Sequence, residues 1–261
     1  MPIFLQVIYF ILFWFLTCHL ATKLSFRLFN DIKVDNKKIT LFSRSFCPLC
    51  GEKLHLLEMV PLLSFLVSKG KCRHCEKNIS RSYLAIEIIL LFCYLLSAWL
   101  FQGINLQSFL FGSILLCLTI QSFIDLRVMM SSDVIHLITL FLSICLGKTF
   151  GISNLQMLIS FVFVIVFLLA IIIPFKIIKK QDGMGFGDVK LYAVLSVLFP
   201  LNYIVYLITI SGICGVLFFY INNVLKKGKN AEFPLIPSIF LSFILTSVVY
   251  FVYLLRQELV L

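Results

Sequence analysis

The sequence predicts an all-α, polytopic membrane protein with about eight transmembrane helices and one small, zinc-ribbon-like cysteine insert. Of its 261 residues, 61% are hydrophobic, whereas a soluble domain is about 45–50% apolar. Charged residues make up 13% of the chain, which is about half the usual share. The mean hydropathy is +1.06, and four cysteines form two C-x-x-C pairs. Most of the chain is therefore expected to lie in a membrane.

Eight apolar stretches each predict one transmembrane helix. They are continuous and do not alternate with polar residues, which favours helices over membrane-spanning strands. The sixth stretch is short and is expected to lie obliquely or to re-enter the membrane. Pro200 and Asn202 separate it from the seventh. The expected spans are residues 3–21, 83–101, 106–124, 134–151, 155–175, 189–200, 202–222 and 235–255.

The first apolar stretch is expected to be a retained anchor and not a cleaved signal peptide. No basic segment precedes it, Lys23 and Arg27 follow it, and no small-residue cleavage site ends it. The predicted organisation has three parts, which are an anchor at 1–21, a tetra-cysteine insert at 22–82 and a transmembrane domain at 83–261.

The placement of positive charge predicts the orientation. Of the 22 lysines and arginines, 12 lie in residues 22–82. With eight spans, all but Lys148 and Arg256 fall on one side of the membrane. By the positive-inside rule that side is the cytoplasm, so both termini are expected outside. The net charge of +10 is then a signal of topology, and it does not indicate nucleic-acid binding.

Cys47 and Cys50 form one C-x-x-C pair, and Cys72 and Cys75 form a second. Each pair can present two thiolates to one tetrahedral ion, so the two pairs predict a closed, structural zinc site. The reducing cytoplasm disfavours a disulfide, and redox thiols or unligated cysteines are the alternative. The remaining cysteines are expected to behave as small apolar side chains; they are Cys18, Cys93, Cys117, Cys145 and Cys214.

Two carboxylates lie at the ends of apolar stretches. Asp125 follows one stretch, and Asp188 follows Gly183, Gly185 and Gly187 at the mouth of another. Acids at bilayer depth are energetically unfavourable, so they indicate function, and two close carboxylates can share one proton and activate water. The glycines allow close backbone approach and positive φ. The alternative is a flexible loop in which Asp188 is only a helix N-cap.

Three further charged residues are candidates for a supporting role. Asp133 precedes the fourth apolar stretch and is expected to cap its helix. Lys190 either lowers the pKa of a nearby carboxylate or faces lipid headgroups. Glu87 lies one helical turn inside the second span, where an unpaired acid is unfavourable. It is expected to stabilise the helix or to line a polar surface.

The combination of these motifs resembles the type IV prepilin peptidases, the leader peptidases of type IV pilus and type II secretion systems. The resemblance covers most of the chain. G-x-G-D alone also occurs in other intramembrane aspartyl proteases, but its combination with the cysteine pairs and an ordered second aspartate is specific. The matching elements are the two cysteine pairs, Val60–Ser64, Gly70–Cys72, Ile79–Tyr83, Glu87, Asp125, Asp133, Gly183–Lys190, Pro234 and Pro237.

The resemblance implies an aspartic endopeptidase with Asp125 and Asp188 as its catalytic pair. Such an enzyme cleaves the basic leader of type IV prepilins or pseudopilins after a glycine, at the cytoplasmic face of the bacterial inner membrane. Many members then N-methylate the new N-terminus with S-adenosylmethionine. The resemblance also implies a link between the insert and a metal such as Zn²⁺. The expected partners are the pilus or type II secretion machinery and membrane lipid, with no nucleic acid.

Two alternatives accompany this interpretation. The chain could be a peptidase without methyltransferase activity. It could also be a non-enzymatic, metal-tethered scaffold or transporter that uses its acids as ion or partner sites. The second alternative requires acids deeper in the spans, whereas Asp125 and Asp188 are expected at helix ends.

Overall fold

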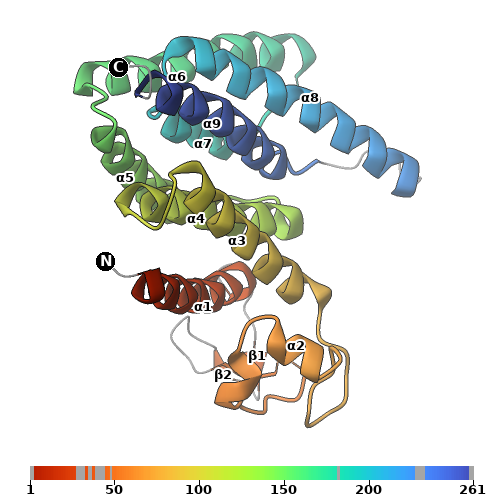
Figure 1. Ribbon diagram of the computed structural model, residues 1–261. Helices are drawn as coiled ribbons and strands as arrows, with labels where there is room; N and C mark the ends of the chain where they lie inside the picture. Colours follow the sequence, from red (N-terminus) through yellow and green to blue (C-terminus); the bar gives the residue numbers. More distant parts are fainter. Residues whose placement is uncertain are drawn as a thin grey trace. The chain divides into compact units, whose positions relative to one another are not determined.

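The computed structural model describes residues 3–27, 33–34, 37–38, 45–47, 49–180, 183–226 and 233–258. Much of the predicted insert between 28 and 48 lies outside these ranges, as do Lys227 and Lys229, on which part of the charge argument rests. The chain divides into two compact units, Met1–Trp99 and Leu100–Leu261. Figure 1 shows the elements of both.

The first unit contains two long helices and a small irregular segment. Tyr94 packs edge-on against Phe10 and Phe13, and Phe26 stacks on Tyr83 at 3.9 Å between ring centroids. These aromatic contacts join the first helix to the last helix of the unit. The elements of the unit are α1 (Ile3–Arg27), β1 (Lys33–Val34), β2 (Lys37–Lys38), η1 (Leu56–Met59), α2 (Leu63–Val67) and α3 (Arg81–Leu100). The two strands pair antiparallel.

The described part of the second unit is a bundle of six helices. One of them, α4, packs against α5 and α9, while α7 packs against α5 and α6, and α8 packs along α9. The bounds are α4 (Leu106–Val128), α5 (Asp133–Thr149), α6 (Asn154–Lys179), α7 (Phe186–Ser196), α8 (Leu201–Lys226) and α9 (Ile236–Glu258).

Helix α4 is the central element of this bundle. It begins with a capping box between Asn105 and Ser108, which satisfies otherwise unpaired N–H groups of the first turn. It ends at Met129, whose left-handed φ of 52° closes the last turn. Phe111 is fully buried and contacts Phe243 and Phe251 of α9. Most of α4 is buried, so the chain holds it in one position between its neighbours.

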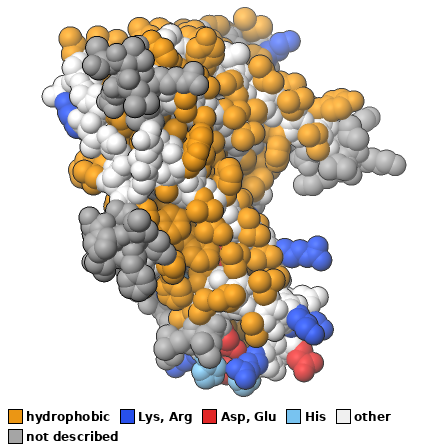
Figure 2. All heavy atoms as spheres, viewed as in Figure 1, with side chains coloured by type: hydrophobic (Ala, Val, Ile, Leu, Met, Phe, Trp, Pro, Cys, Tyr) orange, Lys and Arg blue, Asp and Glu red, His pale blue; other side chains and the backbone are white. Residues whose placement is uncertain are grey.

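Among the described residues, five helices are long and apolar enough to cross a membrane. They are Arg81–Leu100, Leu106–Val128, Asn154–Lys179, Leu201–Ile221 and Ile236–Leu254, and Phe10–Phe26 is a shorter apolar helix. The mean hydropathy of the α6 span is 3.2, yet only 17% of it is buried inside the protein. Figure 2 shows hydrophobic side chains covering the helices, while charged side chains gather over the segment that carries α2. Lipid is the natural partner of such an apolar surface.

Helix α7 is short, as predicted for the sixth apolar stretch, and it is fixed by buried hydrogen bonds. Ser160 of α6 donates to the carbonyl of Phe199 at 2.9 Å. Ser196 donates to the carbonyl of Ser160 at 3.2 Å. Tyr192 and Ser211 of α8 share a hydrogen bond. These contacts hold both the helix and the turn that follows it.

Candidate functional site

Asp125 lies in the last turn of α4, and its side chain is buried. Its Oδ2 accepts a hydrogen bond from the backbone N–H of Ile236 at 3.0 Å. Ile236 is the first residue of α9, and Pro237 follows it in the first turn, where the missing N–H of proline is tolerated. The N-terminal end of a helix carries partial positive charge, so α9 stabilises a negative carboxylate at this position.

Asp188 is the third residue of α7, and its side chain is half-buried. The N-cap of this helix is Gly185, which contributes no side-chain cap, so the alternative in which Asp188 is only an N-cap is wrong. The charge of Asp125 acts on the carboxylate of Asp188. Two acids that are distant in the sequence therefore lie near each other within the second unit.

The three glycines before Asp188 provide close packing. A Cβ at Gly187 would lie 2.0 Å from Ser131 Oγ, and one at Gly183 would lie 2.7 Å from Phe175 Cδ1. At Gly185, a Cβ would lie 3.1 Å from Oδ2 of Asp188 itself. None of the three has positive φ, so that part of the expectation was wrong. Glycine is needed here because neighbouring atoms occupy the space of a side chain.

Asp133 and Lys190 form an ion pair between α5 and α7, with 2.8 Å between Asp133 Oδ1 and Lys190 Nζ. The residue that caps α5 is Ser132, so the prediction that Asp133 caps this helix was wrong. Asp133 is instead the first helical residue, and it is held by a partner on another element. Of the two roles considered for Lys190, contact with a carboxylate is the one observed. The pair links the first turns of α5 and α7, close in sequence to Asp188.

The four cysteines at 47, 50, 72 and 75 form one cluster, in which all sulfur atoms lie within 4.8 Å of one another. The backbone produces this cluster with two similar turns. The N–H of Cys47 bonds to the carbonyl of Glu52, and the N–H of Cys72 bonds to the carbonyl of Lys77, each at 2.9 Å. Gly51 follows the first pair with a φ of 73°. The predicted convergence of the two pairs is confirmed.

The cluster fits a tetrahedral metal ion. Zn–S bonds of about 2.3 Å place the sulfurs of such a site about 3.8 Å apart, and Cys50 Sγ lies 4.0 Å from Cys72 Sγ. A backbone hydrogen bond from Cys75, supported by one from His74, lowers the pKa of the Cys72 thiol to about 7. A lowered pKa favours the thiolate that metals bind. These four residues could hold a metal ion.

Glu87 of α3 restrains a loop in the first unit. Its Oε2 accepts the backbone N–H of Leu62 at 2.8 Å. Leu62 has a φ of 61° and a ψ of −50°, an unfavourable conformation for a side chain with a Cβ, costing about 1–3 kcal/mol. The hydrogen bond to Glu87 offsets part of this strain. Glu87 therefore makes a stabilising contact, although that contact restrains the loop before α2 and not α3 itself.

The sequence interpretation missed three groups near the aspartates. The Ile236 N–H and the Ser131 hydroxyl have no sequence signal, because their importance arises from packing. Gln121 did have a sequence signal, since it is a polar residue within an apolar stretch and lies one helical turn before Asp125. Its side chain is fully buried, and neither polar atom has a hydrogen-bond partner among the described residues.

Two regions of the chain match known protein families. Residues 5–101 match the bacterial peptidase A24 N-terminal domain, and residues 112–220 match the type IV leader peptidase family. The two matches together cover most of the chain and extend through both of its units. No solved structure matches the chain.

Several curated relatives carry the name prepilin leader peptidase/N-methyltransferase. The protein from Vibrio cholerae is 29% identical over 206 residues, which are 78% of this chain and 80% of the relative. The one from Aeromonas salmonicida is 30% identical over 204 residues, which are 77% of this chain and 69% of the relative. The one from Pseudomonas aeruginosa is 31% identical over 193 residues, or 72% of this chain and 64% of the relative.

Proposed function

Since this chain belongs to the type IV prepilin peptidase family and carries its bacterial N-terminal domain, we propose that it cleaves the basic leader of type IV prepilins or pseudopilins. The observation that supports this most directly is that Asp125 and Asp188 belong to one helical unit, near enough for the charge of Asp125 to act on Asp188. Each acid also has a defined position at the end of a helix. This arrangement suits an aspartic endopeptidase that activates one water molecule.

In the proposed mechanism, the two carboxylates share one proton because close like charges disfavour double ionisation. The ionised carboxylate takes a proton from water, whose oxygen attacks the scissile carbonyl. The protonated carboxyl polarises that carbonyl and then protonates the leaving amine as the C–N bond breaks. The Ile236 N–H orients Asp125 throughout. The pair titrates as a unit, so neither residue is assigned a fixed role.

The proposed position of cleavage follows from the charge distribution. With about eight spans, the positive-inside rule places residues 22–82 and the ends of α4 and α7 that carry the acids at the cytoplasmic face. A prepilin has its basic leader on that side and an apolar helix in the bilayer, so its scissile bond would meet the acids. We place the enzyme in the bacterial inner membrane, where the pilus or type II secretion machinery would receive its products.

N-methylation of the new N-terminus is a second proposed activity, supported by the names of the relatives. The neutral amine of the cut pilin would attack the methyl carbon of S-adenosylmethionine. The C–S bond breaks with its electrons moving to sulfur, and the products are an N-methylammonium and S-adenosylhomocysteine. The metal held by the cysteine cluster would have a structural role, because four thiolates leave no open position for a substrate.

Cleavage of a prepilin by the purified full chain tests the first activity. Asp125→Asn and Asp188→Asn should each abolish cleavage while the protein stays folded. Glu76→Gln, which removes the same charge at an exposed site in the first unit, should retain it. Cleavage by both aspartate variants would refute the assignment of the catalytic pair, and absence of cleavage by the wild-type chain would favour a scaffold. Mass spectrometry of the product then tests methylation, which adds one CH₂ unit.

A further inference from the structure

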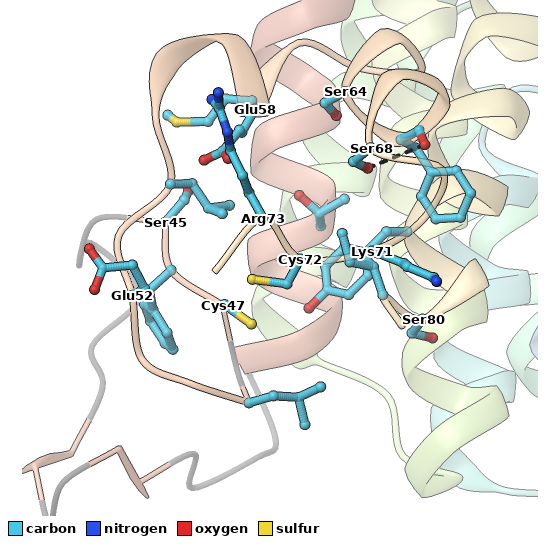
Figure 3. Close-up of a pocket in the computed structure, with 18 of the residues that line it drawn as sticks. Ser45, Cys47, Glu52, Glu58, Ser64, Ser68, Lys71, Cys72, Arg73 and Ser80 are labelled. Carbon is cyan, nitrogen blue, oxygen red and sulfur yellow. Dashed lines mark hydrogen bonds between the residues drawn. The ribbon is translucent and has the colours of Figure 1, made fainter. Parts of the chain in front are cut away.

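Two buried polar side chains of the second unit have no role in the mechanism above. In the first unit, Lys71 and Arg73 line a cavity of about 530 Å³ (Figure 3) and are exposed, so water serves them. Gln121 of α4 and His136 of α5 are instead buried. None of their four side-chain nitrogen and oxygen atoms has a hydrogen-bond partner among the described residues. Such groups are rare in folded proteins, so each needs an explanation.

Gln121 lies on the same face of α4 as Asp125. The two residues are four positions apart, which makes them neighbours on one side of a helix. The charge of Asp125 acts on Asp188 of α7, so this face of α4 is turned toward the acid pair. Gln121 is one helical turn further from the C-terminal end of α4. Its amide is therefore expected beside the acids and deeper in the predicted span.

His136 lies on the face of α5 that is turned toward the start of α7. Its Nδ1 is 3.7 Å from Oδ1 of Asp133, three residues earlier, which is too far for a hydrogen bond. Asp133 itself is held by Lys190 of α7 at 2.8 Å. Asp188 is two residues before Lys190. The imidazole is thus one turn inside α5, on the side where α7 presents its acid.

A contact between α4 and α5 places the two side chains along one seam. The helices pack together and are joined by the short connection Met129–Ser132, so they run antiparallel. Cys117 of α4 and Thr139 of α5 interact through their side chains. One helical turn from this contact, toward the connection, lie Gln121 on α4 and His136 on α5. Both face the seam that ends at the acid pair.

Cleavage inside a membrane creates a need that these groups can meet. A helical substrate must unwind around its scissile bond, which leaves backbone N–H and C=O groups unpaired. Hydrocarbon offers them no partners. The glutamine side chain carries the same amide group as the backbone, with both donors and an acceptor, and a neutral imidazole adds one donor and one acceptor. The two side chains can therefore replace hydrogen bonds that the substrate loses on unwinding.

We propose that Gln121 and His136 bind the backbone of the substrate segment that follows the scissile bond. This inference rests on the proposed peptidase activity. That segment is the apolar part of the substrate, so it reaches deeper than the acids do. Recognition of its backbone does not depend on its side chains, which suits a site that accepts different apolar sequences. The competing occupant is trapped water, which would satisfy the same groups without touching the substrate.

Replacement of single backbone amides by esters in a prepilin peptide tests the proposal, with the full chain in lipid nanodiscs. An ester lacks the N–H and has a weaker carbonyl acceptor, but it keeps the side chains. One ester at a time is placed at the first few peptide bonds after the scissile bond. At the bound position it should lower kcat/KM of the wild-type protein roughly three- to tenfold.

Gln121→Met and His136→Leu each remove one of the proposed partners. In the variant that lacks the partner, the same ester should lower kcat/KM less than about twofold, because the hydrogen bond is already absent. Ser143→Ala is the matched control, since it removes another fully buried hydroxyl without a partner among the described residues. It lies two helical turns beyond His136 on α5 and should keep the full ester effect. Thermal unfolding reports that each variant is folded, and equilibrium binding of the two peptides gives the ratio for a variant that does not cleave.

The outcomes separate this inference from the proposed activity. Loss of the ester effect in Gln121→Met or His136→Leu, with the effect retained in Ser143→Ala, supports the backbone site. An equal ester effect in all variants overturns it and indicates trapped water or packing, even where cleavage is slower. Absence of any ester effect in the wild-type protein overturns it as well. Failure of the wild-type protein to cleave the unmodified prepilin would instead overturn the proposed peptidase function.

Discussion

Gly187→Ala provides a sharp test of how the start of α7 positions the catalytic acid. The new Cβ would lie 2.0 Å from Ser131 Oγ and 3.1 Å from Ser131 Cβ. Rotation of the hydroxyl can relieve the first contact, but the second involves an atom fixed to the backbone. The first turn of α7 must therefore move away from the segment before α5. Asp188 is the next residue, so it moves too.

The magnitude follows from two opposing effects. Alanine in a helix is favoured over glycine by about 1 kcal/mol, and by less in the first turn. Overpacking of a close contact costs about 1–3 kcal/mol. The net change in the free energy of unfolding should thus be a destabilisation of about 1–2 kcal/mol. The effect on catalysis should be larger, because misplacing a reacting group by about 1 Å can reduce the rate about 100-fold.

The assay is the initial rate of prepilin cleavage by enzyme in nanodiscs, with thermal unfolding measured on the same samples. Gly212→Ala is the matched control, because a Cβ there meets nothing within 4 Å. Removing the whole Ser131 side chain in the double variant Gly187→Ala/Ser131→Gly should restore part of the rate, as coupling between contacting residues requires. Normal cleavage by Gly187→Ala, or a double variant no better than the single one, would refute this reasoning.

Four further predictions concern other contacts. Asp133→Asn breaks the ion pair with Lys190, but this pair is largely exposed and solvent screens it, so thermal stability should fall only slightly and the cleavage rate only a few-fold. A complete loss of cleavage would contradict a purely structural pair. Phe251→Ala removes a fully buried ring and should lower stability by about 3–5 kcal/mol, as measured by thermal unfolding. Cys72→Ser should eliminate bound zinc in metal analysis of the purified protein, and full zinc occupancy in this variant would count against the site. Gln121→Leu should leave thermal stability unchanged or raise it, because it removes a buried polar group without a partner among the described residues. The cleavage rate of this variant should drop if the amide holds water or substrate beside Asp125. An unaltered rate would leave Gln121 without a catalytic role.

The helices were predictable because continuous apolar runs are a strong signal. Each of the eight expected spans corresponds to a long helix or, for the sixth, to the short helix α7. That all eight cross the membrane stays a prediction, since five of the described helices are both long enough and apolar enough to do so. The predicted boundaries between the anchor, the insert and the transmembrane domain, at residues 21 and 82, also stay predictions. The short strands β1 and β2 and the five-residue α2 were not foreseen, because such short elements depend on local turns.

The chemistry of the site was predictable in part. Acids at helix ends and paired cysteines can be recognised from residue type and spacing alone. The role of Asp133 was not predictable, because Lys190 reaches it from a different helix. The same holds for the Ile236 N–H, since backbone donors carry no residue-specific signal. The glycines were recognised correctly as a motif, but only the packing shows that Ser131 and Phe175 fill the space beside them.

The shortness of α7 has a consequence for the helices around it. Eleven residues rise about 16 Å, roughly half of a hydrocarbon core about 30 Å thick. The chain reverses beyond this helix, where Ser160 satisfies the carbonyl of Phe199. Seven of the eleven residues are buried, and α5, α6 and α9 pack against the helix. These neighbouring helices, and not lipid, must therefore fill the depth that α7 does not reach.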